Sequence, residues 1–140
     1  MRFFLTFITF LFLNIGTSKE IVIDMLNKRD DGQKMVYSQD IAKIDVGDTI
    51  KWLPTNKGHN VEFLSGPEGF DLPSKSGLNK EVSITFDKPG VYLYVCTPHK
   101  VMGMIALVVV GDDISNKEAI SKVKMMGRGK KKLAELLGQI

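Results

Sequence analysis

CTPHKVMGM, residues 96–104, is the segment of this chain that carries the most chemical information. It holds the only cysteine of the 140 residues, one of the two histidines and two of the seven methionines. A thiolate, an imidazole and a thioether are soft or borderline metal donors. One cysteine with two histidines and a distant axial methionine suits copper in electron-transfer sites. The segment therefore predicts a metal site, which the second histidine, His59, would complete.

The four candidate ligands come from two segments that lie far apart in the sequence. Cys96 ends an apolar strand pattern, the next two residues turn the chain so that His99 faces the same point, and Met104 opens the following strand. His59 lies about forty residues earlier, so only a folded scaffold can bring it to the site. A fixed cage of soft ligands holds a metal ion with little rearrangement between two oxidation states. This arrangement predicts fast electron transfer.

Residues 1–18 have the pattern of a secretory signal peptide. A single positive charge at Arg2 precedes an apolar run at residues 3–13, and Gly16 and Ser18 are small. The run is well short of the ~20 residues of a membrane-spanning helix, and an uncleaved N-terminal anchor stays open as the alternative. Cleavage after Ser18 predicts a mature chain of residues 19–140, which we expect to be one monomeric domain without membrane insertion.

Charge and cysteine content exclude several classes of protein. Residues 19–111 hold 11 basic and 12 acidic residues, whereas residues 112–140 hold seven basic and four acidic ones. A nearly neutral body does not neutralise a phosphate backbone, so nucleic acid is not an expected partner. Cys96 alone cannot form an internal disulfide, and metal ligation would protect its thiol in an oxidising compartment.

Short strand patterns separated by turn residues fill the region from residue 20 to residue 110. Residues 81–86 alternate apolar and polar, which predicts a half-buried strand. Residues 91–96 and 104–110 are apolar on both faces, so another layer must cover this part of the sheet. The patterns that predict strands span residues 20–27, 35–37, 49–53, 61–64, 81–86, 91–96 and 104–110. Residues 65–80 are expected to form a long irregular connection.

The C-terminal tail, residues 112–140, can supply the covering layer. Ser115 and Glu118 have the spacing of a capping box, and apolar residues recur at helical spacing after them. Gly127 and Gly129 are expected to interrupt this helical pattern. A second short helix is predicted at residues 130–137, with one apolar face formed by Leu133, Leu136 and Leu137.

Beyond the ligands, the sequence resembles the pseudoazurins, which are blue-copper proteins of the cupredoxin family. The resemblance rests on KGHNVE around His59, CTPHKVMGM around Cys96, MLNK at residues 25–28, VGDT at residues 46–49 and the helical tail. It runs from about Glu20 to the C-terminus. It implies an all-β Greek-key sandwich of about eight strands at residues 19–111, followed by two short α-helices at residues 112–140.

The resemblance also implies a set of residue roles. One copper ion would be held by His59, Cys96, His99 and Met104, and Met102 is not expected to ligate. Asn60 would hydrogen-bond to the backbone of the ligand loop, and such bonds fix ligand orientation. The implied function is a periplasmic carrier of single electrons to a copper nitrite reductase, a c-type cytochrome or a related respiratory enzyme, without enzymatic activity of its own.

Partner docking is expected around the loop that carries His99. Met102 would belong to a shallow apolar rim, and Lys57, Lys75 and Lys100 lie in loops where they could attract an acidic partner. Lys100 stands where pseudoazurins often have an aromatic residue, which bears on the choice of partner. A charged loop is, however, usually only solvated.

Other interpretations of the same residues stay open at this point. Cys96 and a histidine could act as nucleophile and base, although no familiar hydrolase signature surrounds the cysteine. A structural zinc site, or a module for copper storage or delivery, would use the same donors, but zinc has no redox chemistry. Taken singly, Cys96 and Met104 could be core residues, and the two histidines could be ordinary loop residues.

Overall fold

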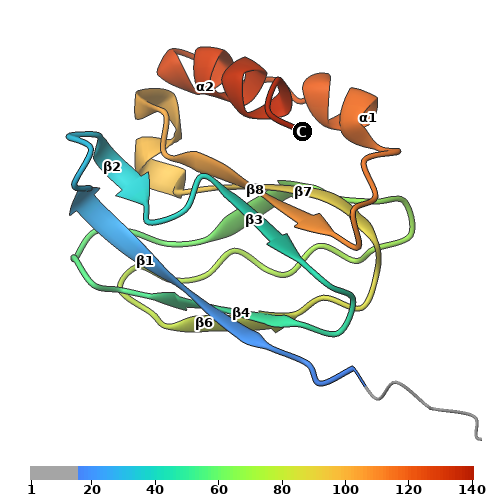
Figure 1. The fold of residues 1–140 in the computed structure, drawn as a ribbon. Coiled ribbons are helices and arrows are strands. Elements are labelled where there is room, and N and C mark those ends of the chain that lie inside the picture. The colour runs from blue at the N-terminus through green and yellow to red at the C-terminus, as the bar shows by residue number, and fades with distance from the viewer. Residues whose placement is uncertain (1–15) are drawn as a thin grey trace, which may run out of the picture.

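The structure is a computed structural model that describes residues 16–140, so residues 1–15 of the predicted signal peptide lie outside the described residues. It consists of two four-stranded sheets packed face to face, with two helices on the outside of one sheet (Figure 1). The first sheet has the strand order β2-β1-β4-β6, and the second has the order β3-β8-β7-β5. The predicted sandwich with two C-terminal helices is confirmed.

The observed strands lie close to the predicted ranges. Val82 and Ile84 of β6 pack against the core and Phe86 is fully buried, as the alternation predicts. The short strand β3 is an addition to the prediction. The eight strands are β1 (Glu20–Lys28), β2 (Lys34–Tyr37), β3 (Ile41–Ile44), β4 (Thr49–Leu53), β5 (Glu62–Ser65), β6 (Val82–Thr85), β7 (Gly90–Val95) and β8 (Ile105–Val110).

Two parallel pairings distinguish this sandwich from a simple set of hairpins. β1 is parallel to β4 and β3 is parallel to β8, whereas the other neighbouring strands are antiparallel. Each parallel pair needs a crossover, because a short hairpin can join only antiparallel strands. The antiparallel pairing of β5 with β7 places Glu62, shortly after His59, opposite Val95, directly before Cys96, so these two distant segments meet at the end of the sandwich where the candidate ligands lie.

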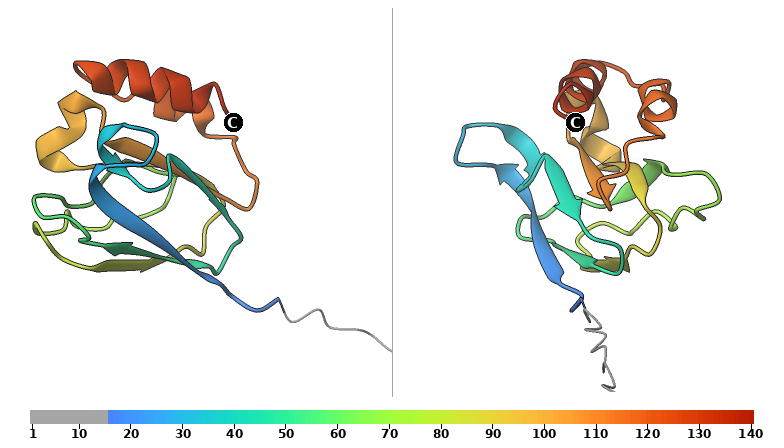
Figure 2. Two further views of the ribbon diagram at one scale, coloured as in Figure 1. Left: turned by 60° about the vertical axis from the view of Figure 1, so that its left-hand side comes forward. Right: turned by 45° about the vertical axis from the view of Figure 1, so that its right-hand side comes forward.

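The side chains of β7 and β8 divide between two cores. Tyr92, Tyr94 and Cys96 face the core between the sheets, together with Trp52 and other buried residues. Val91, Leu93 and Val95 face the opposite side, where Leu133 and Leu136 of the C-terminal helix cover them. The predicted covering layer is therefore present, and Figure 2 shows both helices against the same side of the sandwich.

The C-terminal helices are α1 (Lys117–Ser121) and α2 (Arg128–Leu137). The predicted capping box is wrong, because α1 begins after Asn116 and no side chain caps it. The side chain of Asn116 instead hydrogen-bonds to the backbone N–H and C=O of Val91. This tertiary bond replaces the local one, and it fixes α1 against the start of β7.

Gly129 lies inside α2, which begins at Arg128, two residues before the predicted start of that helix. The expectation that both glycines interrupt the helical pattern holds only for Gly127, which precedes α2 with φ +60°. Within residues 16–140, no helix is long and apolar enough to cross a membrane.

Candidate metal centre

The candidate ligands converge at one end of the sandwich. Cys96 directly follows β7, and His99 lies in the 3₁₀ helix η1 (Thr97–Met102) that joins β7 to β8. Met104 stands immediately before β8, and its carbonyl accepts a hydrogen bond from the N–H of Cys96. His59 comes from the connection between β4 and β5. The predicted sharp turn after Cys96 is thus a short helix with Pro98 in its first turn.

Three donor atoms lie within bonding range of one point. Nδ1 of His59 and Nδ1 of His99 are 3.1 Å apart, and Sγ of Cys96 is 3.7 Å from the first and 3.4 Å from the second. A point equidistant from the three atoms lies about 2.0 Å from each, which matches the ~2.0–2.3 Å bonds of imidazole nitrogen and thiolate sulfur to a metal ion such as zinc. The triad is arranged for a single small ion.

His59 is fully buried, and a hydrogen bond fixes its tautomer. Its Nε2 lies 2.8 Å from Oδ1 of Asn27, an acceptor, so Nε2 carries the proton and the lone pair of Nδ1 is free for a metal. Burial, and then the neighbouring His99, lower the pKa of His59. Burial also lowers the pKa of His99. Both imidazoles are therefore kept in the neutral form that binds metals.

Cys96 is fully buried in the core between the sheets. Burial raises the pKa of its thiol, against the opposing effect of backbone N–H groups of Asn60 and His99 that point at the sulfur. Without a metal ion the sulfur therefore keeps its proton at neutral pH. A cation must displace this proton to bind, which makes binding dependent on pH.

Asn60 connects the two ligand-bearing segments. Its Oδ1 accepts a hydrogen bond of 2.7 Å from the N–H of Thr97, and its Nδ2 donates to Oγ1 of Thr97 at 2.8 Å and to the carbonyl of Ser76 at 3.2 Å. Oγ1 of Thr97 in turn donates to Glu62 at 2.6 Å. The hydroxyl of Tyr37 donates to the carbonyl of Asn60 at 2.8 Å. The neighbours of both His59 and Cys96 are thus fixed relative to each other.

The two methionines of the loop occupy different environments. Met104 is fully buried and belongs to the same core cluster as Cys96, which is the position of a ligand or of a core residue. Met102 is 45% exposed and is the last residue of η1.

Lys57 and Lys75 are exposed and Lys100 is half-buried. The apolar rim and the charges predicted around the site are therefore accessible from solvent.

Several residues that orient this site have no signal of their own in the sequence. Asn27, Glu62, Thr97 and Tyr37 contact the ligand-bearing segments only through strand pairing and loop packing. Three of them nevertheless lie in motifs that contribute to the resemblance: Asn27 in MLNK, Glu62 in KGHNVE and Thr97 in CTPHKVMGM. Their roles depend on tertiary contacts that a linear pattern does not contain.

The donor set fits copper. Two neutral imidazoles, one thiol that can ionise on binding and a buried thioether nearby are the soft and borderline donors of copper electron-transfer centres. Among residues 16–140, the only cluster of three or more such His, Cys, Asp or Glu donors is the triad His59, Cys96 and His99.

Comparison with known proteins agrees with a copper-binding centre. Residues 23–111 match the family of copper binding proteins, plastocyanin/azurin family. The pseudoazurin of Methylorubrum extorquens is 44% identical over 127 residues, covering 89% of this chain and 84% of the relative. The pseudoazurin of Paracoccus pantotrophus is 38% identical over 120 residues, covering 84% of this chain and 81% of the relative.

Solved structures resemble the whole fold. The pseudoazurin of Hyphomicrobium denitrificans superimposes with a TM-score of 0.79 at 39% identity, covering 86% of this chain and 98% of that one. The pseudoazurin of Methylobacterium extorquens AM1 gives a TM-score of 0.78 at 43% identity, with the same coverage of both chains. The similarity extends beyond the residues that the copper-binding family match covers.

Proposed function

The chain belongs to the pseudoazurins, blue-copper electron carriers of the plastocyanin/azurin family, and on this premise we propose that its copper ion is held by His59, Cys96, His99 and Met104. The observation that supports this proposal is the convergence of three donor atoms around one buried point. Met104 would be the distant axial thioether, because it is buried in the same cluster as Cys96. When bound, copper supplies a reversible one-electron change between Cu(I) and Cu(II).

The protein's own contribution is to hold the donors still and to keep water away from them. Asn27 fixes the ring of His59, and Asn60 fixes the backbone at Thr97. Burial of Cys96 excludes solvent from the sulfur. Because the donors already lie close to bonding positions, a change of oxidation state requires little movement. No bond in an organic substrate is made or broken.

His99 is the proposed exit for the electron. His59 is fully buried, whereas His99 is partly exposed in η1, next to the exposed Val101 and Met102. A partner would dock on this rim through a small and short-lived interface, with Lys57 and Lys100 attracting an acidic surface. The proposed partners are a copper nitrite reductase or a c-type cytochrome.

The proposed location is the periplasm. The predicted signal peptide at residues 1–18 would direct the chain there, and a single domain at residues 19–140 would remain after cleavage. Export also agrees with the lone cysteine, whose thiol would be protected by the metal in an oxidising compartment.

Addition of Cu(II) to the metal-free protein tests the proposed site. We expect an intense visible sulfur-to-copper absorption band, an electron-spin spectrum of the blue-copper type and reversible reduction. Zinc gives no visible band, so a site built for zinc alone would fail this test. Folded protein that binds Cu(II) without the band would refute the ligand set.

A second experiment tests the axial position. Met104→Gln should keep copper and lower its reduction potential, because the axial donor tunes the potential of such centres. Met102→Gln is the matched control and should leave the potential nearly unchanged. An unchanged potential in Met104→Gln would remove Met104 from the proposed ligands.

A further inference from the structure

The first turn of α2 lies directly against the backbone of the ligand loop. A Cβ atom on Gly129 would come within 2.5 Å of the carbonyl oxygen of Lys100, and a Cβ on Gly127 within 2.7 Å of that of Val101. Real Cβ atoms essentially never approach so closely, so only glycine allows this packing. The two carbonyls belong to the residues that directly follow His99 in η1.

The contacted carbonyls also hold the loop together. The N–H of Gly103 donates to the carbonyl of Lys100 at 3.1 Å, and the N–H of Met104 donates to the carbonyl of His99 at 3.2 Å. These two bonds close the turn that returns the chain from His99 to Met104. A contact that positions the carbonyl of Lys100 therefore also positions this turn.

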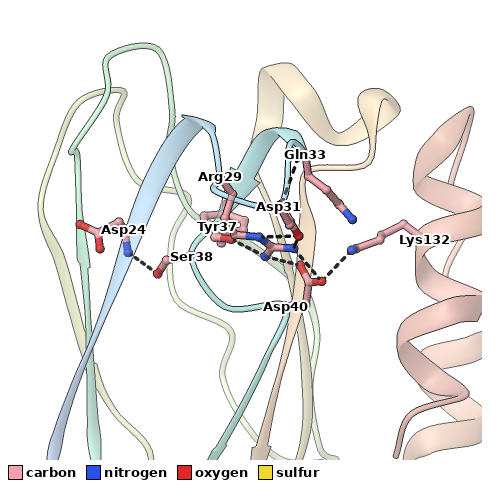
Figure 3. A network of polar contacts seen from close by, with 8 residues as sticks. All are labelled: Asp24, Arg29, Asp31, Gln33, Tyr37, Ser38, Asp40 and Lys132. Atoms are coloured by element: carbon pink, nitrogen blue, oxygen red, sulfur yellow. Dashed lines mark hydrogen bonds and ion pairs between the residues drawn. The ribbon is translucent and has the colours of Figure 1, made fainter.

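One turn along α2, an ion network fixes the helix to the sandwich (Figure 3). Nζ of Lys132 lies 2.9 Å from Oδ2 of Asp40, and the other carboxylate oxygen of Asp40 accepts a hydrogen bond of 3.0 Å from Arg29. Arg29 also donates to the carbonyl of Tyr37 at 3.0 Å and pairs with Asp31. The side chains of Lys132, Arg29 and Asp40 are only 12%, 18% and 25% exposed, so solvent screens these pairs less than surface pairs.

The network joins three segments at a single carboxylate. Asp40 directly precedes β3, and its carbonyl accepts the N–H of Leu107 in β8, the strand that leads away from Met104. Arg29 follows the end of β1. Lys132 is three residues after Gly129, and residues at this spacing lie on the same side of a helix. The pair with Asp40 thus fixes the position of α2 at which Gly129 contacts the ligand loop.

From this geometry we propose that the C-terminal helix is a brace for the metal site, in which Gly129 and Lys132 act as positioning residues for the loop that carries His99. The proposal rests on the ligand set proposed above. Gly129 sets how closely α2 approaches the loop, and the Lys132–Asp40 pair prevents the helix from sliding or lifting. A displaced helix would release the carbonyl of Lys100 and let His99 move relative to Cys96.

Gly129→Ala tests the contact, with Gly138→Ala, at the C-cap of the same helix, as the control. A Cβ on Gly138 meets only ordinary or slightly tight distances of 3.4 and 3.5 Å. We expect amide hydrogen exchange at Gly103 and Met104 to accelerate about tenfold in Gly129→Ala, in metal-free and copper-loaded protein alike. In the loaded protein, the electron-spin and visible spectra should shift. The control should change neither.

Lys132→Met tests the network without altering the loop contact, with Lys131→Met as its control because the Lys131 side chain is 84% exposed. Loss of the Lys132–Asp40 pair should accelerate exchange at the same two amides, and Lys132→Arg should restore their protection. This second variant keeps the proposal testable if Gly129→Ala does not fold.

Two outcomes would overturn the proposal. One is that both variants lower the free energy of unfolding while loop exchange and spectra stay unchanged, because α2 would then only stabilise the fold. The other is that Lys131→Met has the same effect as Lys132→Met. Exchange in the metal-free protein does not depend on copper, so a failure of the proposed ligand set would be recognised separately, by a missing sulfur-to-copper band.

Discussion

His59 and His99 belong to the same proposed metal centre, but the protein holds them by different means. His59 is fully buried, its ring is hydrogen-bonded to Asn27, and its carbonyl accepts the N–H of Asn79. His99 is partly exposed in the short 3₁₀ helix η1, whose backbone rests on Gly127 and Gly129 at the start of α2. In the proposed function this difference separates two tasks, because the buried His59 would fix the metal and the partly exposed His99 would let an electron leave.

The sulfur of Cys96 lies near the Nδ1 atoms of both histidines, so removal of Cys96 should have the largest effect on the metal centre. Cys96→Ala removes the only thiol and leaves two imidazoles, and we expect complete loss of the visible sulfur-to-copper band. Absorption and electron-spin spectra after addition of Cu(II) measure this. Cys96→Ala protein that kept the band would show that another group supplies the charge-transfer donor.

Asn60 joins the segment of His59 to the loop that carries His99, and Asn60→Ala should remove this connection. The change leaves the N–H of Thr97 and the carbonyl of Ser76 without their partner. Each unsatisfied buried group costs ~1–3 kcal/mol, so the free energy of unfolding should fall by about 2–3 kcal/mol. Urea unfolding of the metal-free protein gives this value. Asn56→Ala, at a more exposed asparagine, is the control, and an equal loss there would contradict the role given to Asn60.

The side chain of Asn27 acts on the buried His59 and not on His99. Asn27→Ala removes the acceptor that fixes the tautomer of His59, and loss of such a partner typically costs ~10–100-fold in metal affinity. Competition with a copper chelator at fixed pH measures the affinity. The fold should persist, because Asn27 is exposed on β1. Unchanged affinity would mean that burial by itself orients His59.

Acid should lower the free energy of unfolding through Asp40, which pairs with Lys132 of α2. We expect this effect to be the smallest of those predicted here. Burial raises the pKa of this carboxyl, but hydrogen bonds from Arg29 and Lys132 outweigh burial, and the net pKa lies below the ordinary value. A lowered pKa in the folded state stabilises the fold above pH ~4, and this contribution disappears as the pH falls through the folded pKa. Asp40→Asn should therefore be less stable than the natural chain at pH 7, by up to ~1 kcal/mol for ion pairs that remain partly exposed.

The same pair of proteins should differ less at pH 3 than at pH 7, because protonation removes the charge of Asp40 as the pH falls through its folded-state pKa. Urea unfolding at both pH values measures the two differences. Asp31→Asn is the control, since Asp31 also pairs with Arg29 but does not contact Lys132. A difference that stayed constant between pH 7 and pH 3 would show that Asp40 does not act through its charge.

The strands were predictable because their burial follows simple patterns. Ile50 and Trp52 alternate with polar residues in β4, and β7 and β8 are apolar on both faces, which also predicted the covering helices. The short β3 has no pattern of its own, and its place is set by pairing with β8. Local reasoning about Ser115 failed because the side chain of Asn116 makes a tertiary bond to Val91.

The proposed ligands could be selected from the sequence for a chemical reason, whereas the residues that hold them could not. A cysteine, two histidines and a methionine are rare enough in this chain to stand out. Asn27 and Lys132 are common polar residues whose partners lie 32 and 92 positions away. Gly129 looked like an interruption of a helix, because the close approach of the ligand loop cannot be seen from the sequence.

A crystal structure of the copper-loaded protein, with anomalous data at the copper edge, would test the proposed centre directly. We expect one strong peak between Nδ1 of His59, Nδ1 of His99 and Sγ of Cys96, with the sulfur of Met104 as the fourth and more distant neighbour. A copper peak elsewhere in the folded protein, or one that lacks Cys96 as a neighbour, would contradict this arrangement.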